Sequence, residues 1–248
     1  MVKFFRKIRQ RLLSQNRLRK YTLYAIGEII LVMIGILLAL QVNNWNINRQ
    51  KNHKSNYYLN EILENLKYDT LNINGILAFN NEKREALHTA ANELGSPETQ
   101  ANRLMAIGRR YNLLGGYYVF EPNRIGYSNM MSAESIELIQ NDSIRGVLAY
   151  YYGFDYKGYR QVKHKEICEE FIEYYNHNYM TKEFVNLLFN IEVDIRSDYD
   201  VEIWNDPKVY SYFALIEHYM NFQDFLLNEK KKTLISLIDQ INTELSLE

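Results

Sequence analysis

One uninterrupted apolar stretch constrains this chain more than any other feature. It covers residues 23–42 and reads LYAIGEIILVMIGILLALQV, in which only Glu28 and Gln41 are not apolar, Gly or Tyr. As an α-helix rising ~1.5 Å per residue it reaches about 30 Å, the thickness of the hydrocarbon core of a bilayer. Tyr21 and Tyr24 at one end and Trp45 at the other lie where aromatic anchors are expected at membrane interfaces. The stretch therefore predicts a transmembrane helix over residues 21–45.

The regions on the two sides of this helix differ in charge. Residues 1–20 hold eight Lys and Arg and no acid, whereas the residues after the helix hold 21 basic and 29 acidic side chains. Short basic flanks remain in the cytoplasm. We therefore expect a cytoplasmic N-terminus in the bacterial inner membrane, with residues 46–248 as a periplasmic domain. The basic arm, residues 1–20, suits an interfacial helix on anionic lipid or, alternatively, a docking peptide for a cytoplasmic partner.

A cleaved signal peptide is the competing interpretation of the first forty or so residues. Its apolar part would be longer than usual and no A-x-A-like cleavage site follows, so the pattern favours an uncleaved signal anchor. Cys168 is the only cysteine, which excludes an intrachain disulfide. The stability of the periplasmic domain must therefore come from packing.

Small residues form a ridge along one face of the predicted span. With a spacing of four, the ridge comprises Gly27, Leu31, Gly35 and Ala39. Such ridges let helices approach each other closely in lipid, so we expect self-association. Glu28 shares nearly the same face, and an acid within a span is a functional hypothesis by default. Three roles stay open for Glu28: interfacial or helix-packing, oligomer-specifying, and proton handling.

Helical periodicity continues through most of the remaining chain. Apolar residues recur at helical spacing from Leu59 to Leu77, and no strand-like alternation competes with them. Ser96, Pro97 and Glu98 give the cap, first-turn Pro and acid of a helix start, and Asp142 is expected to cap the helix that begins at Ser143. Further helices are predicted over residues 82–94, 96–115, 133–140, 143–152, 158–179 and 182–191.

Two segments interrupt this helical pattern. Residues 117–128 contain Pro122, Gly126 and four aromatic side chains, which predicts a loop or a small hairpin. Residues 197–205 form an acidic connector. Asp206 and Pro207 then repeat the cap-and-Pro signal that opens a helix.

The C-terminal region carries the longest apolar seam. Its spacing of three and four, with Lys231 in the one gap, is typical of a bundle helix of about 40 residues. The seam comprises Val209, Phe213, Ile216, Met220, Gln223, Leu227, Leu234, Ile238, Ile241 and Leu245. Paired with the segment from Tyr57, it predicts an all-α fold: one N-terminal transmembrane helix, then a helical bundle with a long C-terminal helix.

Part of this pattern resembles a known family. The runs 24–29 (YAIGEI), 34–37 (IGIL) and 39–46 (ALQVNNWN) are similar to the N-terminal signature of an uncharacterised family of Bacteroidota single-pass membrane proteins, the DUF6090 type. Residues 135–142 and 148–151 loosely resemble a second segment of that family. The resemblance implies a single-pass, helical, envelope-facing protein and implies no activity.

Side chains that carry chemistry are sparse. His164 and Cys168 lie one helical turn apart, and Glu169, Glu173 and His177 repeat the interval, but a metal site needs three or four converging ligands. No phosphate loop, nucleophile elbow or di-iron motif occurs. We therefore expect no catalytic residue, no bound metal and no cofactor. The acidic periplasmic charge also argues against a nucleic-acid partner.

The function hypotheses follow from these expectations. The favoured one is a non-enzymatic, membrane-anchored scaffold or interaction protein, self-associating and contacting an envelope protein. The 21 tyrosines suit core and boundary positions or, alternatively, that partner surface. The rival hypothesis is an accessory subunit of an ion-coupled envelope complex that uses Glu28. A sensor is disfavoured because the cytoplasmic arm is too short for a signalling domain.

Overall fold

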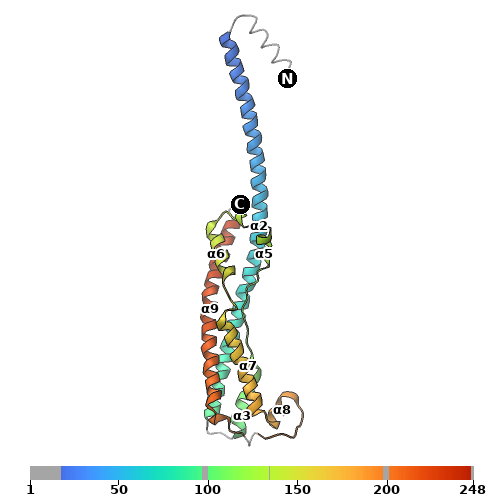
Figure 1. The fold of residues 1–248 in the computed structure, drawn as a ribbon, viewed down its shortest axis with the longest axis vertical. Helices are drawn as coiled ribbons and strands as arrows, with labels where there is room; N and C mark the ends of the chain where they lie inside the picture. Colours follow the sequence, from blue (N-terminus) through green and yellow to red (C-terminus); the bar gives the residue numbers. More distant parts are fainter. Residues whose placement is uncertain (1–17, 97–99, 134, 198–200, 247–248) are drawn as a thin grey trace. The chain divides into compact units, whose positions relative to one another are not determined.

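The chain folds into helices. The computed structural model describes residues 18–96, 100–133, 135–197 and 201–246, and all their regular elements are α-helices or short 3₁₀ helices (Figure 1). This confirms the all-α prediction. By contacts the chain divides into two compact units, residues 1–56 and 57–248.

The described part of the first unit belongs to α2 (Leu18–Gly95). Residues 29–50 of this helix all have exposed side chains. An 18-residue window within it has a mean hydropathy of 2.5, and none of that window is buried inside the protein. A helix that is apolar on every side gains little from facing water. This part of α2 therefore has the length and composition to cross a membrane, as the sequence predicts.

In the second unit, α2 from Tyr57 onward pairs antiparallel with α9 (Pro207–Ser246) (Figure 1). Polar contacts fix the register: Asn80 Nδ2 donates to Gln223 Oε1 at 2.9 Å, and Arg84 Nη2 donates to Asp224 Oδ2 at 2.6 Å. One turn further along α2, His88 Nε2 lies 3.0 Å from Glu217 Oε2. Rising numbers on α2 thus meet falling numbers on α9.

Both long helices bury side chains with alternating steps of three and four. The buried series is 59, 62, 66, 69, 73, 76, 80, 83, 87, 90 and 94 on α2, and 209, 213, 216, 220, 223, 227, 230, 234, 237 and 241 on α9. The predicted seam of α9 is wrong at two positions, because Lys230 and Leu237 are the buried residues and Lys231 and Ile238 are only half-buried. A strict 3.5-residue repeat keeps one seam facing its partner, whereas the predicted seam took two successive steps of four.

The third layer of the bundle consists of α6 (Asp142–Gly153) and α7 (Tyr159–Tyr179), which both pack on α9. Ser143 Oγ donates to Gln240 Oε1 at 3.0 Å, so α6 lies against the C-terminal half of α9. The rings of Phe171 and Phe213 are 5.6 Å apart, so α7 lies against its N-terminal half. As predicted, α7 begins just after Gly158 and ends at Tyr179.

The segments 57–77 and 82–94, predicted as separate helices, are one helix. Neither Gly nor Pro lies between Leu77 and Glu82, and the Asn80 side chain is buried by its contacts with α9. Tertiary packing therefore carries α2 through a polar stretch that weakens the local helical pattern.

Two short helices, α3 (Gln100–Gly108) and α4 (Tyr111–Gly115), replace the single helix predicted over residues 96–115. The Arg110 guanidinium forms two hydrogen bonds with Glu93, at 2.8 and 2.9 Å, and a third with the Ala106 carbonyl at 2.8 Å. It thereby satisfies a carbonyl at the end of α3, and the chain turns there. The helix end at Gly115–Gly116 is confirmed; the predicted start at Pro97 and Glu98 lies outside the described residues.

The predicted loop is confirmed only in its first part. Residues 116–124 have no regular secondary structure, no strand occurs in the described chain, and α5 (Ile125–Ser132) follows. A Cβ on Gly126 would lie 3.0 Å from the backbone of Glu61 and Ile62. Glycine at this position therefore lets α5 pack directly on α2.

The helix predicted over residues 133–140 is wrong. Only a 3₁₀ turn, η1 (Ile136–Leu138), forms, and the chain then becomes extended through Ile139 and Asn141. Asn141, rather than the predicted Asp142, caps α6 by accepting hydrogen bonds from the amides of Ser143 and Ile144. A capping residue needs extended backbone before the helix, which prevents a continuous helix here.

The last connection contains α8 (Lys182–Phe189) and η3 (Ile203–Asn205). The predicted end of α8 at Ile191 is two residues too late, because Asn190 adopts a left-handed conformation with φ 54° that ends the helix. The predicted opening of α9 is confirmed: Asp206 Oδ1 accepts from the Lys208 amide at 2.8 Å, and Pro207 is the first helical residue.

The apolar core of the bundle has two clusters. One contains Leu87, Ala90 and Leu94 of α2 with Phe171, Tyr175 and the α9 residues from Val209 to Met220. The other contains the α2 residues from Leu59 to Ile76 with α6 and the α9 residues from Leu227 to Ile241. Along both long helices the clusters are separated by buried polar side chains.

Candidate functional site

The predicted membrane-helix residues lie on the first part of α2. Gly27, Gly35 and Ala39 are exposed, and a Cβ on Gly27 or Gly35 would meet no atom within 4 Å. Glu28, like Tyr24, is half-buried. The predicted anchor Trp45 is exposed with the Arg49 guanidinium 5.8 Å from its ring centroid, and the Tyr21 side chain lies outside the described residues. The small-residue face is thus available for contact with another helix.

A buried polar layer crosses the bundle between the two apolar clusters. It comprises Asn80 and Lys83 of α2, Gln161, His164 and Cys168 of α7, and Gln223 of α9, all almost fully buried. Gln223 Nε2 donates to Gln161 Oε1 at 2.9 Å and to the Tyr118 carbonyl at 2.8 Å. Gln161 in turn bonds both backbone groups of Phe120. The polar layer therefore connects α2, α7 and α9 with one another and with the irregular segment 116–124.

Lys83 occupies the centre of this polar layer. Its Nζ donates to the Gly116 carbonyl at 2.6 Å and to Cys168 Sγ at 3.0 Å. Burial lowers the pKa of Lys83 and raises the pKa of the Cys168 thiol, although the lysine opposes the second shift. Burial thus favours the uncharged form of each partner, and the thiol is shielded from solvent.

The predicted His–Cys–Glu ladder on α7 divides between two faces. His164 and Cys168 point into the polar layer, whereas Glu169, Glu173 and His177 are exposed. Burial lowers the pKa of His164 to about 4, and the nearby Lys83 adds to that shift. Among the described residues no three His, Cys, Asp or Glu side chains converge on one point. The ladder therefore does not assemble a ligand set.

A second buried polar group, Asp69, lies within the core cluster that contains the α2 residues from Leu59 to Ile76. Asp69 is fully buried on α2, where it accepts hydrogen bonds from the Tyr151 hydroxyl and the Asn123 amide, both at 2.9 Å. Burial raises the pKa of Asp69 to about 6, and the two hydrogen bonds partly offset this effect. Asp69 therefore ties α6 and the irregular segment 116–124 to α2.

Exposed apolar side chains gather at α8 and the residues after it. The members, which we call the α8 tip, are Leu187, Phe189, Ile191 and Ile195, each between 43% and 64% exposed. The opposite side of α8 packs inward, with Phe184 against the rings of Tyr111 and Tyr175 at 5.2 and 5.3 Å. Figure 1 shows α8 and the following chain standing out beside α7.

Hydrogen bonds hold the α8 tip in place. Arg196 Nε donates to the Met180 carbonyl at 2.9 Å, and the Lys182 amide donates to the Arg196 carbonyl at 3.0 Å. Ser197 Oγ adds a 2.8 Å bond to Glu183. Hydrogen bonds therefore join the start of α8 to residues 196–197, while the apolar residues of the α8 tip face solvent.

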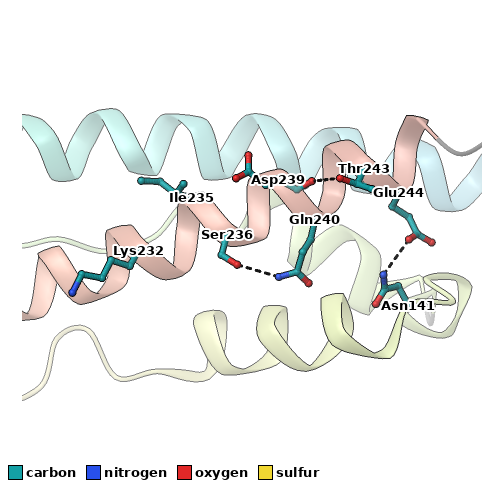
Figure 2. A pocket seen from close by; sticks show the side chains of 8 residues that line it. All are labelled: Asn141, Lys232, Ile235, Ser236, Asp239, Gln240, Thr243 and Glu244. Atoms are coloured by element: carbon teal, nitrogen blue, oxygen red, sulfur yellow. Dashed lines mark hydrogen bonds between the residues drawn. The ribbon is translucent and has the colours of Figure 1, made fainter.

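An open groove runs along α9 beside the start of α6. Figure 2 shows Ser236, Gln240 and Glu244 on the side of α9 that faces α6, with Glu244 meeting Asn141. Asn141 Nδ2 donates to Glu244 at 3.1 Å, and Gln240 Nε2 donates to Ser236 at 3.2 Å. Asn141, Ser236, Gln240 and Glu244 thus bond within the groove, as side chains of an interhelical contact do.

The tyrosines are mostly structural. Tyr151, Tyr152, Tyr156, Tyr175 and Tyr179 are buried in the core clusters, whereas Tyr57, Tyr68, Tyr118 and Tyr150 are exposed at separate places. This supports core and boundary packing as their main role.

Sequence reasoning missed Lys83, Asn80, Asp69 and Gln161. A signal was present for three of them, because Asp69, Asn80 and Lys83 fall on the three-and-four series of α2 and are polar where the series is otherwise apolar. On α9, the same three-and-four spacing correctly predicts that Gln223 lies on the buried seam. The α8 tip had no such signal, since sequence periodicity does not say which apolar residues stay uncovered.

These features define a class of protein: an all-α chain that combines one helix apolar enough to cross a membrane with a bundle containing a buried polar layer. Within that class, the chain belongs to a family of unknown function, DUF6090, whose model matches residues 28–200. The match covers more than half of the chain and confirms the family resemblance. No curated protein and no solved structure matches the chain.

Proposed function

We propose that this protein is a membrane-anchored interaction protein that presents the α8 tip to an envelope protein. It acts without catalysis, is held in a bacterial inner membrane by the first part of α2, and keeps its N-terminus in the cytoplasm and its bundle in the periplasm. The charge difference between residues 1–20 and the chain after the span supports this orientation.

The observation that carries the proposal is the α8 tip itself. Large apolar side chains on a soluble surface are normally scattered, and contiguous ones mark contact sites. Here four of them lie within nine residues on α8 and the segment after it, and hydrogen bonds join the two ends of this region. Because these hydrogen bonds hold the segment in place, we expect binding to cost little further conformational entropy.

The charges around the α8 tip indicate the chemistry of the partner. Glu192 and Asp194 are exposed between Ile191 and Ile195, and the Arg196 side chain is occupied by backbone carbonyls. An apolar surface with acidic neighbours is complementary to an apolar groove with basic residues on its rim. We assign this groove to a protein partner.

Site-specific photo-crosslinking in native membranes tests the proposal. We expect a benzophenone side chain at Phe189 to give one discrete protein adduct, and the same group at exposed Asn186 on the same helix to give none. Adding Ile195→Asp should lower the adduct yield by about tenfold, because it places a charge in an apolar contact. Equal adducts from both positions, or none from Phe189, would refute the α8 tip as the contact site.

Cys168 provides the control for folding in this experiment. It is the only cysteine and is buried, so a folded variant resists maleimide labelling until denaturant is added. Each crosslinking variant should show the same protection as the wild type.

A further inference from the structure

A second hollow lies between the start of α7 and α9, and we call it the aromatic pocket. It has a volume of about 410 Å³, within the range of small-molecule sites. Its walls are apolar and mostly aromatic, comprising Phe154, Tyr156, Phe222, Phe225 and Leu226. Phe225 is 68% exposed, so one wall of the pocket leaves a large ring in water.

The floor of the aromatic pocket consists of Gln161 and Gln223, whose amide groups are already engaged. Gln161 Oε1 accepts from the Phe120 amide and from Gln223 Nε2, and its Nε2 donates to the carbonyls of Phe120 and Tyr156. Gln223 Oε1 accepts from Asn80. The floor is therefore held by hydrogen bonds, and its amide donors are used within the described part of the chain, which suits an apolar body resting on it.

The positively charged group at the rim of the aromatic pocket is Arg160. Its guanidinium lies 3.9 Å from the ring centroid of Phe222 and donates no hydrogen bond to any residue in the described part of the chain. A guanidinium has five N–H donors in a fixed fork that fits a carboxylate. Arg160 is thus held in position by stacking while its donors remain available.

A second cation lies behind the aromatic wall. Lys230 is almost fully buried, and its Nζ has no hydrogen-bond acceptor among the described residues. The ammonium lies 3.5 Å from the ring centroid of Phe154 and 5.7 Å from that of Tyr156, both of which line the pocket. Charges separated by one ring in a partly buried site still attract, so Lys230 favours an anion on the other side of Phe154.

One acid, Asp155, also lines the pocket. Its carboxylate lies beside the start of α7, 3.2 Å from where a Cβ on the N-cap residue Gly158 would be. There it offsets the positive end of the helix dipole and leaves Arg160 and Lys230 as two cations against one acid. The local charge is therefore positive.

From this geometry we propose that the aromatic pocket binds a small amphipathic anion: an apolar or aromatic body that rests on the glutamine floor, with one carboxylate bound by Arg160. This site is separate from the α8 tip and does not depend on the function proposed for it. The ligand should carry one anionic group, because Arg160 is the available guanidinium at the rim.

Photoaffinity labelling of the full-length protein in lipid nanodiscs tests this proposal. The probe is 4-benzoylbenzoate, and the matched neutral competitor is 4-benzoylbenzamide. We expect the labelled peptides to contain residues 154–161 or 222–226. The neutral amide should compete with the probe about tenfold less well than an analogue of the probe that keeps the carboxylate.

Three variants separate the charge from the apolar contact. Arg160→Gln should weaken labelling about tenfold by removing the charged donor, and Phe225→Ala should weaken it by opening one wall. Arg109→Gln, the same change at an exposed arginine between α3 and α4, should leave labelling unchanged. Protection of Cys168 from maleimide checks that each variant is folded.

The proposal is overturned by labelling elsewhere in the chain, by equal competition from the neutral amide, or by an equal effect of Arg160→Gln and Arg109→Gln. Labelling that depends on Phe225 but not on Arg160 would also overturn it, since the pocket would then be a merely apolar hollow.

Discussion

At the scale of single residues, two buried titratable side chains have opposite effects on stability over the same pH range. Asp69 has its pKa raised from 3.8 to about 6, and His164 has its pKa lowered from 6.5 to about 4, both mainly by burial. Burial disfavours the charged form in each case, which is the carboxylate of Asp69 and the imidazolium of His164. Between about pH 4 and pH 6 the two contributions therefore oppose each other.

For Asp69, stability should fall as pH rises. The unfolded carboxyl loses its proton near pH 4, whereas the folded one keeps it to about pH 6, so rising pH favours the unfolded state over this interval. Asp69→Asn removes this titration and keeps an acceptor for the Asn123 amide. From pH 4 to pH 7, the wild type should lose about 2 kcal/mol of unfolding free energy relative to Asp69→Asn. Urea unfolding followed by tryptophan fluorescence measures the difference, and Asp194→Asn, at an exposed acid, is the matched control.

For His164 the sign is reversed. The unfolded imidazole takes up a proton below pH 6.5 and the folded one only near pH 4, so falling pH favours the unfolded state. Relative to His164→Gln, the wild type should lose about 3 kcal/mol between pH 7 and pH 4. The same unfolding series measures it, with His177→Gln at an exposed histidine as control. Parallel pH profiles for His164→Gln and the wild type would show that His164 is not buried in its neutral form.

At the scale of elements, the start of α6 tests which residue caps a helix. Asn141 accepts from two amides of the first turn, whereas Asp142 is exposed and, within the described chain, pairs only with Arg145 on its own helix. Asn141→Ala should lower the unfolding free energy by about 1 kcal/mol, and Asp142→Ala by a few tenths at most. Chemical denaturation of the two variants compares them directly. A larger loss from Asp142→Ala would support the cap predicted from sequence.

The elements also show how far sequence periodicity reaches. The apolar span, α7, the start of α9 and most of its seam followed from spacing and caps, because these signals are local. The continuity of α2 and the burial of Lys230 in place of Lys231 did not follow from local signals, because both depend on neighbouring elements. Asn80 is buried by its contacts with α9, and Lys230 by the rings of Tyr150 on α6 and of Phe154 after it. The helix predicted over residues 133–140 failed because the extended approach to the Asn141 cap excludes it.

The candidate sites were less predictable than the fold. His164, Cys168 and Gln223 could be singled out from the sequence, yet their grouping around Lys83 brings together α2, α7 and α9. Arg160 and Phe222 are likewise 62 positions apart in the numbering of the chain and meet only because α7 lies on α9. Chemistry that depends on long-range packing leaves no local pattern.

At the scale of the whole molecule, the chain joins an apolar helix with exposed small residues to a bundle divided by a polar layer. Buried polar residues in a helical seam often serve to fix register rather than to add stability. In this bundle Asn80 and Gln223 bond each other across the seam, so they fix the pairing of α2 with α9. These polar contacts thus fix how the two long helices of the bundle pair with each other.

Self-association through the span is the remaining prediction at this scale. Gly35 is exposed with no atom within 4 Å of an added Cβ, so Gly35→Leu is accommodated within the protein itself and should act only on contact with another helix. Close packing of helices in lipid depends on such small residues, and we expect the substitution to weaken self-association roughly tenfold. Energy transfer between labelled copies in liposomes, measured as lipid dilutes the protein, reports the change. Leu37→Phe enlarges a side chain on the opposite face and should leave the transfer unchanged; an equal loss from both variants would place the contact elsewhere, because a packing effect specific to the Gly35 face cannot be produced from the other side of the helix.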